Sequence, residues 1–211
     1  QRIVQNLQKN RGQGMEAVFQ QTPVLNMMNA KYVIYNPQAQ AIQNPYANGG
    51  AWFVKQLALK NTAREVVDAL KTMNTDSMAV VHQKFAEYAK PANYSGEGQI
   101  ELTNYDPETM TYSSNSSSEQ FAVFSEIYYR GEEGDWQAYI DDEPARHIRV
   151  NYVLRGMKIP AGEHEIVFKF RPKSYYAGET ISLTSSIILV LVVLLSLFLY
   201  FRKHPELLKQ K

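Results

Sequence analysis

The chain contains no cysteine, and its positive and negative charges almost cancel. Without cysteine, disulfide bonds, thiolate metal sites and cysteine nucleophiles are all excluded. Lys and Arg total 22 against 21 for Asp and Glu, so the formal net charge of the 211 residues is +1. Nucleic-acid-binding proteins usually present a clustered basic face. This charge balance therefore predicts no nucleic-acid partner.

The common sequence motifs of catalysis and of metal or phosphate binding are also missing. The histidines have no metal-ligand spacing and form no HExxH pattern, so the sequence predicts no metal site. It has no nucleophile elbow with a Ser-His-Asp order and no glycine-rich phosphate loop. We therefore expect no cofactor and no catalytic residue in this segment.

One long apolar run lies near the C-terminus. Residues 181–201 carry no charged side chain and are almost purely apolar from Ile187 onward. As a helix this run would be roughly 31 Å long, enough to cross a bilayer core of about 30 Å. A buried core helix of this length would show a polar stripe, whereas here only Ser and Thr near the start are polar. We therefore predict one transmembrane helix.

The flanks of this run indicate its orientation. Residues 202–211 carry four basic side chains against one acidic side chain. The positive-inside rule then places this tail in the cytoplasm and residues 1–180 outside the membrane. The chain starts at Gln1 without the basic start and apolar core of a signal peptide. We therefore expect a membrane span or an export signal upstream.

Four strands in succession are predicted over residues 121–172. Apolar side chains alternate with more polar ones over residues 121–129, 136–140, 148–154 and 166–170. This period-2 pattern is typical of strands with one buried face. Gly, Asp and Pro residues separate the runs and supply the chemistry of turns.

Short strands joined by tight turns favour an antiparallel sheet, most simply a β-sandwich of the jelly-roll kind. We expect the strands of this sandwich to lie within residues 100–172. The residues predicted to be buried are Phe121, Val123, Ile148, Val150, Tyr152, Phe168 and Phe170.

The N-terminal part begins with a predicted helix, strand and loop. Thr22 is a good N-cap and Pro23 suits the first helical position, so a helix is expected to start there. Residues 31–35 read as a strand. Residues 36–50 are rich in Asn, Gln, Pro and Gly, and loops of this length are often functional.

A second helix is predicted between two further strands. Thr62 and Glu65 have the spacing of a capping box, and strand patterns lie on either side at residues 51–59 and 78–81. This order predicts a small α/β element beside the sandwich, with a right-handed crossover if its strands are parallel.

Together the patterns predict a mainly β protein with an α/β N-terminal part, an antiparallel jelly-roll-like sandwich and one transmembrane helix. The predicted division of the chain is 1–98 for the α/β part, 99–178 for the sandwich, 181–201 for the transmembrane helix and 202–211 for the cytoplasmic tail.

Acidic and aromatic residues cluster over residues 126–143. Two carboxylates can hydrolyse a glycosidic bond when they lie about 5 to 9.5 Å apart. Asp141, Asp142 and Glu143 match hairpin-turn chemistry better, and the acidic residues over 132–135 match a solvated loop. We therefore favour this structural interpretation of the acidic residues over hydrolysis.

Glu126 lies inside a predicted strand. Its carboxylate either pairs with Arg149 or Arg155, which we favour, or binds a sugar hydroxyl. Aromatic rings present broad apolar surfaces with polar tips that suit stacking on sugars, although both tryptophans fit a core position better. The candidate ligand-binding residues are Trp52, Glu126, Tyr128, Trp136, Tyr139 and Arg155.

Several stretches together resemble one protein family. They are SEIYYRGEEGDWQAYIDDEP (125–144), RVNYVLRGMKIPAGEHEIVFKFRPKSYYAG (149–178), TPVLNMMNAKYVI (22–34) and GGAWFVKQ (49–56). With the apolar run that follows, they resemble the C-terminal part of the bacterial YfhO family of multispan membrane proteins.

The resemblance implies a lipid-linked sugar transferase with many membrane helices and a soluble extracytoplasmic domain near its C-terminus. It implies a bacterial plasma membrane, with lipid-linked sugar or an envelope glycopolymer as ligand and the rest of the multispan protein as partner. The family's catalytic acidic residue would lie in an early extracytoplasmic loop outside this chain.

Two functions therefore remain open. In the first, the chain is an accessory domain that positions sugar or substrate for a YfhO-like transferase. In the second, it is a membrane-tethered β-sandwich that serves as an interaction module and has no transferase role.

Overall fold

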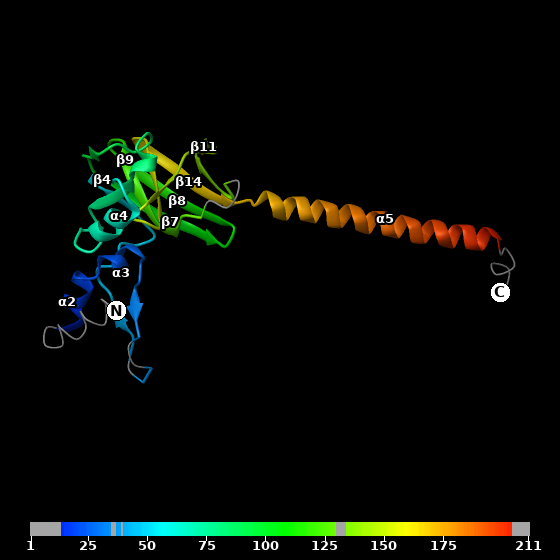
Figure 1. Cartoon of the computed structure of the whole chain (residues 1–211), viewed down its shortest axis with the longest axis horizontal. Coiled ribbons are helices and arrows are strands. Elements are labelled where there is room, and N and C mark those ends of the chain that lie inside the picture. The colour runs from blue at the N-terminus through cyan, green and yellow to red at the C-terminus, as the bar shows by residue number, and fades with distance from the viewer. Residues whose placement is uncertain (1–13, 35–36, 39, 130–133, 204–211) are drawn as a thin grey trace.

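The computed structural model describes residues 14–34, 37–38, 40–129 and 134–203, and strands dominate it. Figure 1 shows the strands gathered in one body, with small blue N-terminal elements on one side and the long helix α5 (Lys173–Lys203) running outward. The predicted fold class, mainly β with a few helices and a long apolar C-terminal helix, is confirmed.

The smaller sheet has five antiparallel strands in the order β11-β10-β14-β8-β7. Its side chains alternate as predicted: in β8, buried Met110 and Tyr112 flank the more exposed Thr111. The strands are β7 (Gly98–Asp106), β8 (Thr109–Ser116), β10 (Trp136–Ile140), β11 (Glu143–Ala145) and β14 (Gly162–Phe170).

The larger sheet has seven strands in the order β3-β9-β13-β12-β5-β4-β6. Its strands pair antiparallel except for β4 and β5, which are parallel. The strands are β3 (Ala51–Val54), β4 (Gln56–Lys60), β5 (Met78–His82), β6 (Ala92–Asn93), β9 (Gln120–Ile127), β12 (Ile148–Val150) and β13 (Leu154–Ile159).

Helix α4 (Ala63–Ala69) joins the two parallel strands, and it starts where the capping box predicts. Thr62 Oγ1 accepts a hydrogen bond from Glu65 N at 3.2 Å, and the Glu65 carboxylate accepts one from Asn61 N at 3.0 Å. These bonds satisfy backbone N–H groups that a helix start otherwise leaves free.

Strands β4 and β5, which α4 connects, belong to the larger sheet. The sequence pattern had predicted this α/β element beside the sandwich instead. Strand β5 pairs with β12 through Val81 and Val150, and Asn151 Oδ1 accepts a hydrogen bond from Val80 N at 2.8 Å. The sheet thus takes strands from both sides of residue 98. Alternation within a strand cannot reveal this because it does not specify the pairing partner.

The expected strand over residues 51–59 is divided. The N–H groups of Lys55 and Gln56 both donate to Ser77 O, so β3 and β4 separate at Lys55 and pair with different neighbours.

Small helices and strands make up the rest of the N-terminal part. The helix expected at Pro23 is present, but Thr22 Oγ1 donates to Val18 O at 2.9 Å instead of capping it. Of the strand expected over 31–35, residues 32–33 are a strand, and residue 35 lies outside the described residues. The elements are α2 (Gly14–Gln20), α3 (Pro23–Met27), β1 (Tyr32–Val33), β2 (Ile42–Gln43) and η1 (Gln83–Phe85).

Both faces of the larger sheet are buried at β9, where residues 120–124 are buried without interruption. Phe121 and Val123 join one core with Met27 of α3, while Ala122 and Phe124 join a second core with side chains of the smaller sheet. This second core lies between the two sheets and also contains Tyr112, Met157, Ile159, Ile166 and Phe168.

The prediction of one strand over residues 148–154 is wrong, because the chain turns back at Asn151. Asn151 and Tyr152 have φ angles of 46° and 71°, and Val150 pairs with Leu154 across the resulting hairpin. Asn favours this left-handed conformation, whereas Tyr adopts it at a cost. Tyr152, predicted to be buried, is 43% exposed as a result.

The other predicted core residues are mostly confirmed. Phe121, Val123, Ile148, Val150 and Phe168 are buried, and Phe170 is only partly buried.

Helix α5 is continuous and leaves the β body, as predicted for residues 181–201. None of its apolar window is buried, and the mean hydropathy of that window is 2.7. In the described part of the chain it is the one helix long and apolar enough to cross a membrane.

Candidate functional site

A buried arginine lies at the centre of the candidate site. Arg155 on β13 is 2% exposed and faces the smaller sheet. Its Nε donates to Ile127 O at 3.1 Å, while Nη1 has no hydrogen-bond partner among the described residues. Burial lowers the pKa of Arg155 to about 10, and the nearby Glu126 carboxylate opposes this shift. The guanidinium therefore stays charged at neutral pH.

Aromatic rings surround this charge. The guanidinium carbon of Arg155 lies 4.1 Å from the centroid of the Trp136 ring and 5.1 Å from that of Phe168. The His147 ring meets both Phe168 and Tyr128 edge-on, with centroids 5.4 Å apart in each case. Cation–π attraction thus stands in for the carboxylate partner that a buried arginine usually has.

A β-bulge brings Glu126 to the arginine. Leu154 pairs with Ile127 but Arg155 pairs with Phe124, so Ser125 and Glu126 are the extra residues on β9. Bulges redirect side chains, and here Ile127, an apolar position of the alternating run, is 49% exposed.

The Glu126 carboxylate is partly buried. Burial raises its pKa and the charge of Arg155 lowers it. No salt bridge joins these two described residues, so they interact at longer range. Arg149, the other predicted partner, instead lies 5.8 Å from the Tyr152 ring.

A surface depression of about 410 Å³ lies along β10 and β11, over this buried cluster. Tyr139 Oη donates to Gln137 Oε1 at 2.7 Å, and Lys169 Nζ lies 5.0 Å from the Tyr139 ring. Gln137 and Tyr139 alternate with Trp136 along β10, so their side chains point to the other face of the sheet, and Lys169 is not among the lining residues. Its lining residues are Trp136, Gln137, Ala138, Tyr139, Pro144, Ala145, Arg146 and His147.

The depression lies at the end of the sheet from which α5 leaves. Trp136 pairs with Phe170 at the end of β14, and their ring centroids are 5.1 Å apart. Arg171 N then donates to Asp135 O at 2.7 Å, and α5 begins two residues later at Lys173. A linker this short leaves the site little freedom to move away from the helix.

His147 is a functional candidate that the sequence did not suggest. Burial lowers its pKa to about 4, and the charge of Arg155 adds to this shift, so His147 is neutral at physiological pH. In the sequence, the histidines were assessed only as possible metal ligands. Its place next to Ile148, at the start of the alternating run, was the signal that its side chain would point to the face opposite that of Ile148.

Five of the six predicted ligand residues gather at this site. Tyr128 meets the His147 ring and Arg155 lies over the Trp136 ring. Glu126 is near enough to Arg155 to feel its charge, and Tyr139 is among the residues that line the depression. Trp52 does not belong to it. Its ring is buried in the first core, and Nε1 donates to Thr75 O at 2.9 Å.

Turn chemistry explains the acidic residues nearby, as predicted. Asp141 and Asp142 have positive φ angles in the turn between β10 and β11, and Asp141 Oδ2 lies 2.6 Å from His164 Nδ1. Residues 132–133 of the acidic cluster lie outside the described residues. No group of three or more metal-ligating side chains occurs in the residues that the structure describes.

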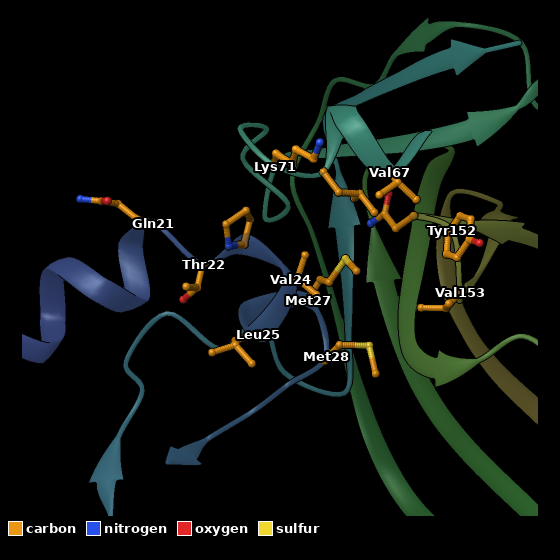
Figure 2. Close-up of a pocket in the computed structure, with 13 residues that line it drawn as sticks. Gln21, Thr22, Val24, Leu25, Met27, Met28, Val67, Lys71, Tyr152 and Val153 are labelled. Atoms are coloured by element: carbon orange, nitrogen blue, oxygen red, sulfur yellow. The ribbon is translucent and has the colours of Figure 1, made fainter. Parts of the chain in front are cut away.

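A separate apolar groove of about 470 Å³ lies near α3. Figure 2 shows side chains of α3 and Met28 on one side, facing Val67 and the β12–β13 turn on the other. Met27 is buried as a core residue, while Met28 is 37% exposed in the groove. The one lysine among the lining residues, Lys71, already hydrogen-bonds to Asp68.

Comparison with known proteins gives one family. Residues 16–182 match the family described as bacterial membrane protein YfhO. The chain matches no curated protein and no solved structure. The match spans most of the 211 residues and includes both sheets and the start of the apolar helix. The protein therefore belongs to the YfhO family of bacterial membrane proteins.

Proposed function

We propose that the β body is an extracytoplasmic accessory domain that holds a sugar-bearing, lipid-linked ligand beside the membrane. It performs no bond chemistry itself and serves the catalytic part of a multispan sugar transferase. The observation that carries this proposal is the Trp136 ring, held over the buried Arg155 guanidinium at the edge of the depression along β10 and β11.

The chemistry of the depression suits a sugar with an attached phosphate. Trp136 offers aromatic surface for a sugar ring, and the amide of Gln137 at the edge of the depression is available to its hydroxyls. Arg146 is exposed at the rim, and Lys169 lies beside Tyr139. Cations of this kind suit a phosphate, which links such sugars to their lipid.

The position of the depression also favours a membrane-bound ligand. Residues 173–180 of α5 add roughly 12 Å of helix between the β body and the start of the apolar run. The site then stands just above the headgroup region, which extends about 5 to 7 Å beyond the hydrocarbon core. The basic residues at the far end of α5, Arg202 and Lys203, support an extracytoplasmic β body.

A fluorine NMR titration tests this proposal. The full chain, labelled with 5-fluorotryptophan in phospholipid nanodiscs, gives two resonances because it contains two tryptophans, Trp52 and Trp136. A Trp52→Phe variant assigns them. A short-chain prenyl-phosphoryl hexose is expected to shift the Trp136 resonance with millimolar affinity, about −4 kcal/mol.

Two comparisons make the titration specific. The Arg146→Gln variant should weaken binding of the phosphorylated ligand, and prenyl phosphate without a sugar should give a smaller shift of Trp136. If no lipid-linked sugar moves the Trp136 resonance, the proposal is wrong.

The alternative function is a membrane-tethered interaction module. The apolar groove in Figure 2 favours it, because Val24, Met28 and Val67 are exposed there. A crosslink from Met28 to a partner protein, together with an unmoved Trp136 resonance, would select this function over sugar positioning.

A further inference from the structure

A polar cavity of about 540 Å³ lies on the opposite side of α3 from the apolar groove, apart from the Trp136 site. We propose that this cavity is a second binding site, for a neutral sugar. The proposal does not depend on the function assigned to the depression. The lining residues are Gln20, Pro23, Asn26, Pro45, Tyr46, Ala47, Asn48, Thr72, Met73, Asn74, Thr75 and Asp76.

The floor of the cavity is a fixed network of buried polar groups. Asn26 Nδ2 donates to Phe19 O, and Asn44 Nδ2 donates to Asn26 Oδ1, both at 3.0 Å. Thr75 Oγ1 donates to Pro23 O at 3.2 Å, and Asn26, Asn44 and Thr75 are all buried. A ligand would therefore meet a site that is already formed, which lowers the entropic cost of binding.

The rim of the cavity keeps hydrogen-bonding groups for a ligand. Asn74 Oδ1 accepts from Asp76 N at 3.1 Å, which leaves the Asn74 amide hydrogens to donate. Asn48 Nδ2 reaches Thr75 Oγ1 only at 3.4 Å, close to the limit for a hydrogen bond. The Asp76 carboxylate is exposed and takes part in no ion pair among the described residues.

The composition of the walls selects the ligand class. None of the described lining residues is Lys, Arg or His, so the cavity lacks the cations that a phosphate or carboxylate ligand needs. Asp76 is the one carboxylate in that lining, too few for a calcium site. Amides, hydroxyls and one carboxylate instead suit a neutral ligand rich in hydroxyl groups, and the cavity volume lies in the range of ligand sites.

Trp52 reports on this cavity. Its Nε1 donates to Thr75 O at 2.9 Å, and Thr75 lines the floor. In the two-resonance fluorotryptophan spectrum, Trp52 therefore senses the cavity while Trp136 senses the depression, so each proposal is tested by its own signal.

The test is a titration of the full chain in nanodiscs with free glucose, galactose and maltose. At least one sugar is expected to shift Trp52 in a saturable way in the millimolar range. Because a carboxylate hydrogen bond is worth about tenfold or more in affinity, Asp76→Asn should weaken that binding by about tenfold. The matched control Asp106→Asn, at an exposed position of β7, should leave the affinity unchanged.

Three results would contradict the proposal that the cavity is a second binding site. They are a Trp52 resonance that no sugar moves, an equal shift in the Asp76→Asn variant, and an equal shift with inorganic phosphate. None of these results bears on Trp136, and a silent Trp136 resonance does not bear on the cavity.

Discussion

The guanidinium carbon of Arg155 lies 4.1 Å from the centroid of the Trp136 ring, between two sheets that bury the arginine almost completely. Burial lowers the pKa of His147 and the same charge adds to this shift, whereas burial raises the pKa of Glu126 and the charge opposes that rise. One buried cation therefore acts on both titratable groups and supports the ring that we propose as the sugar platform.

Replacing this cation should move two pKa values in the same direction. In an Arg155→Met variant the pKa of His147 and the pKa of Glu126 should both rise, because the positive charge that lowers each is gone. NMR titration of the two side chains measures this. Arg149→Met is the matched control, since Arg149 lies over Tyr152 on the neighbouring strand. Unchanged values in Arg155→Met would show that the charge does not reach them.

His147 should make stability depend on pH. Its folded pKa of about 4 lies below the ordinary value of 6.5, so between these values the unfolded chain binds a proton that the folded chain does not. Stability should therefore fall as the pH drops from about 6.5 to 4, by on the order of 2 kcal/mol. Urea unfolding at several pH values should show a smaller slope for His147→Gln. An identical slope would mean that His147 titrates normally in the fold.

Phe168 should be a major determinant of stability. It is fully buried between the sheets, and its ring packs edge-on against Tyr112, Phe124 and His147. Phe168→Ala should cost about 3 to 5 kcal/mol because it leaves a cavity. Phe170→Ala, a partly buried position on the same strand, should cost clearly less. Chemical denaturation gives both values, and a Phe168→Ala loss under about 1 kcal/mol would contradict its place in the core.

Replacing Tyr152 by glycine should increase the free energy of unfolding. Its φ angle of 71° is a left-handed conformation that costs an L-residue about 1 to 2 kcal/mol and costs glycine little. Tyr152→Gly should therefore stabilise the protein by about 0.5 to 1 kcal/mol in urea unfolding. Tyr152→Ala removes the same ring without relieving the backbone, so it should give no gain. Equal effects of the two variants would contradict the argument from backbone strain.

Local patterns predicted the individual elements well, and they failed where distant pairing decides. The alternation around Phe121, the capping box at Thr62 and the charge-free run from residue 181 all depend on neighbours in sequence, and each gave the observed element. The hairpin at Asn151 did not follow from alternation, because apolar residues on both sides of the turn kept the same period through it.

The candidate site was predicted as a set of residues but not as an arrangement. Aromatic and charged residue types suggested Trp136 and Arg155. Nothing in the sequence showed that the Trp136 ring would lie over the Arg155 guanidinium. The bulge at Ser125 and Glu126 arises from the register between β9 and β13, which a single sequence does not encode in any local pattern.

The most direct test of the central claim is binding of a short-chain prenyl-phosphoryl hexose to two Trp136 variants by calorimetry in nanodiscs. If Trp136 is the sugar platform, Trp136→Phe should keep most of the affinity and Trp136→Ala should lose about tenfold, since stacking of this kind is worth roughly 1 kcal/mol or more. An unchanged Trp52 fluorine resonance would verify that Trp136→Ala remains folded. Wild-type affinity in folded Trp136→Ala would contradict the claim.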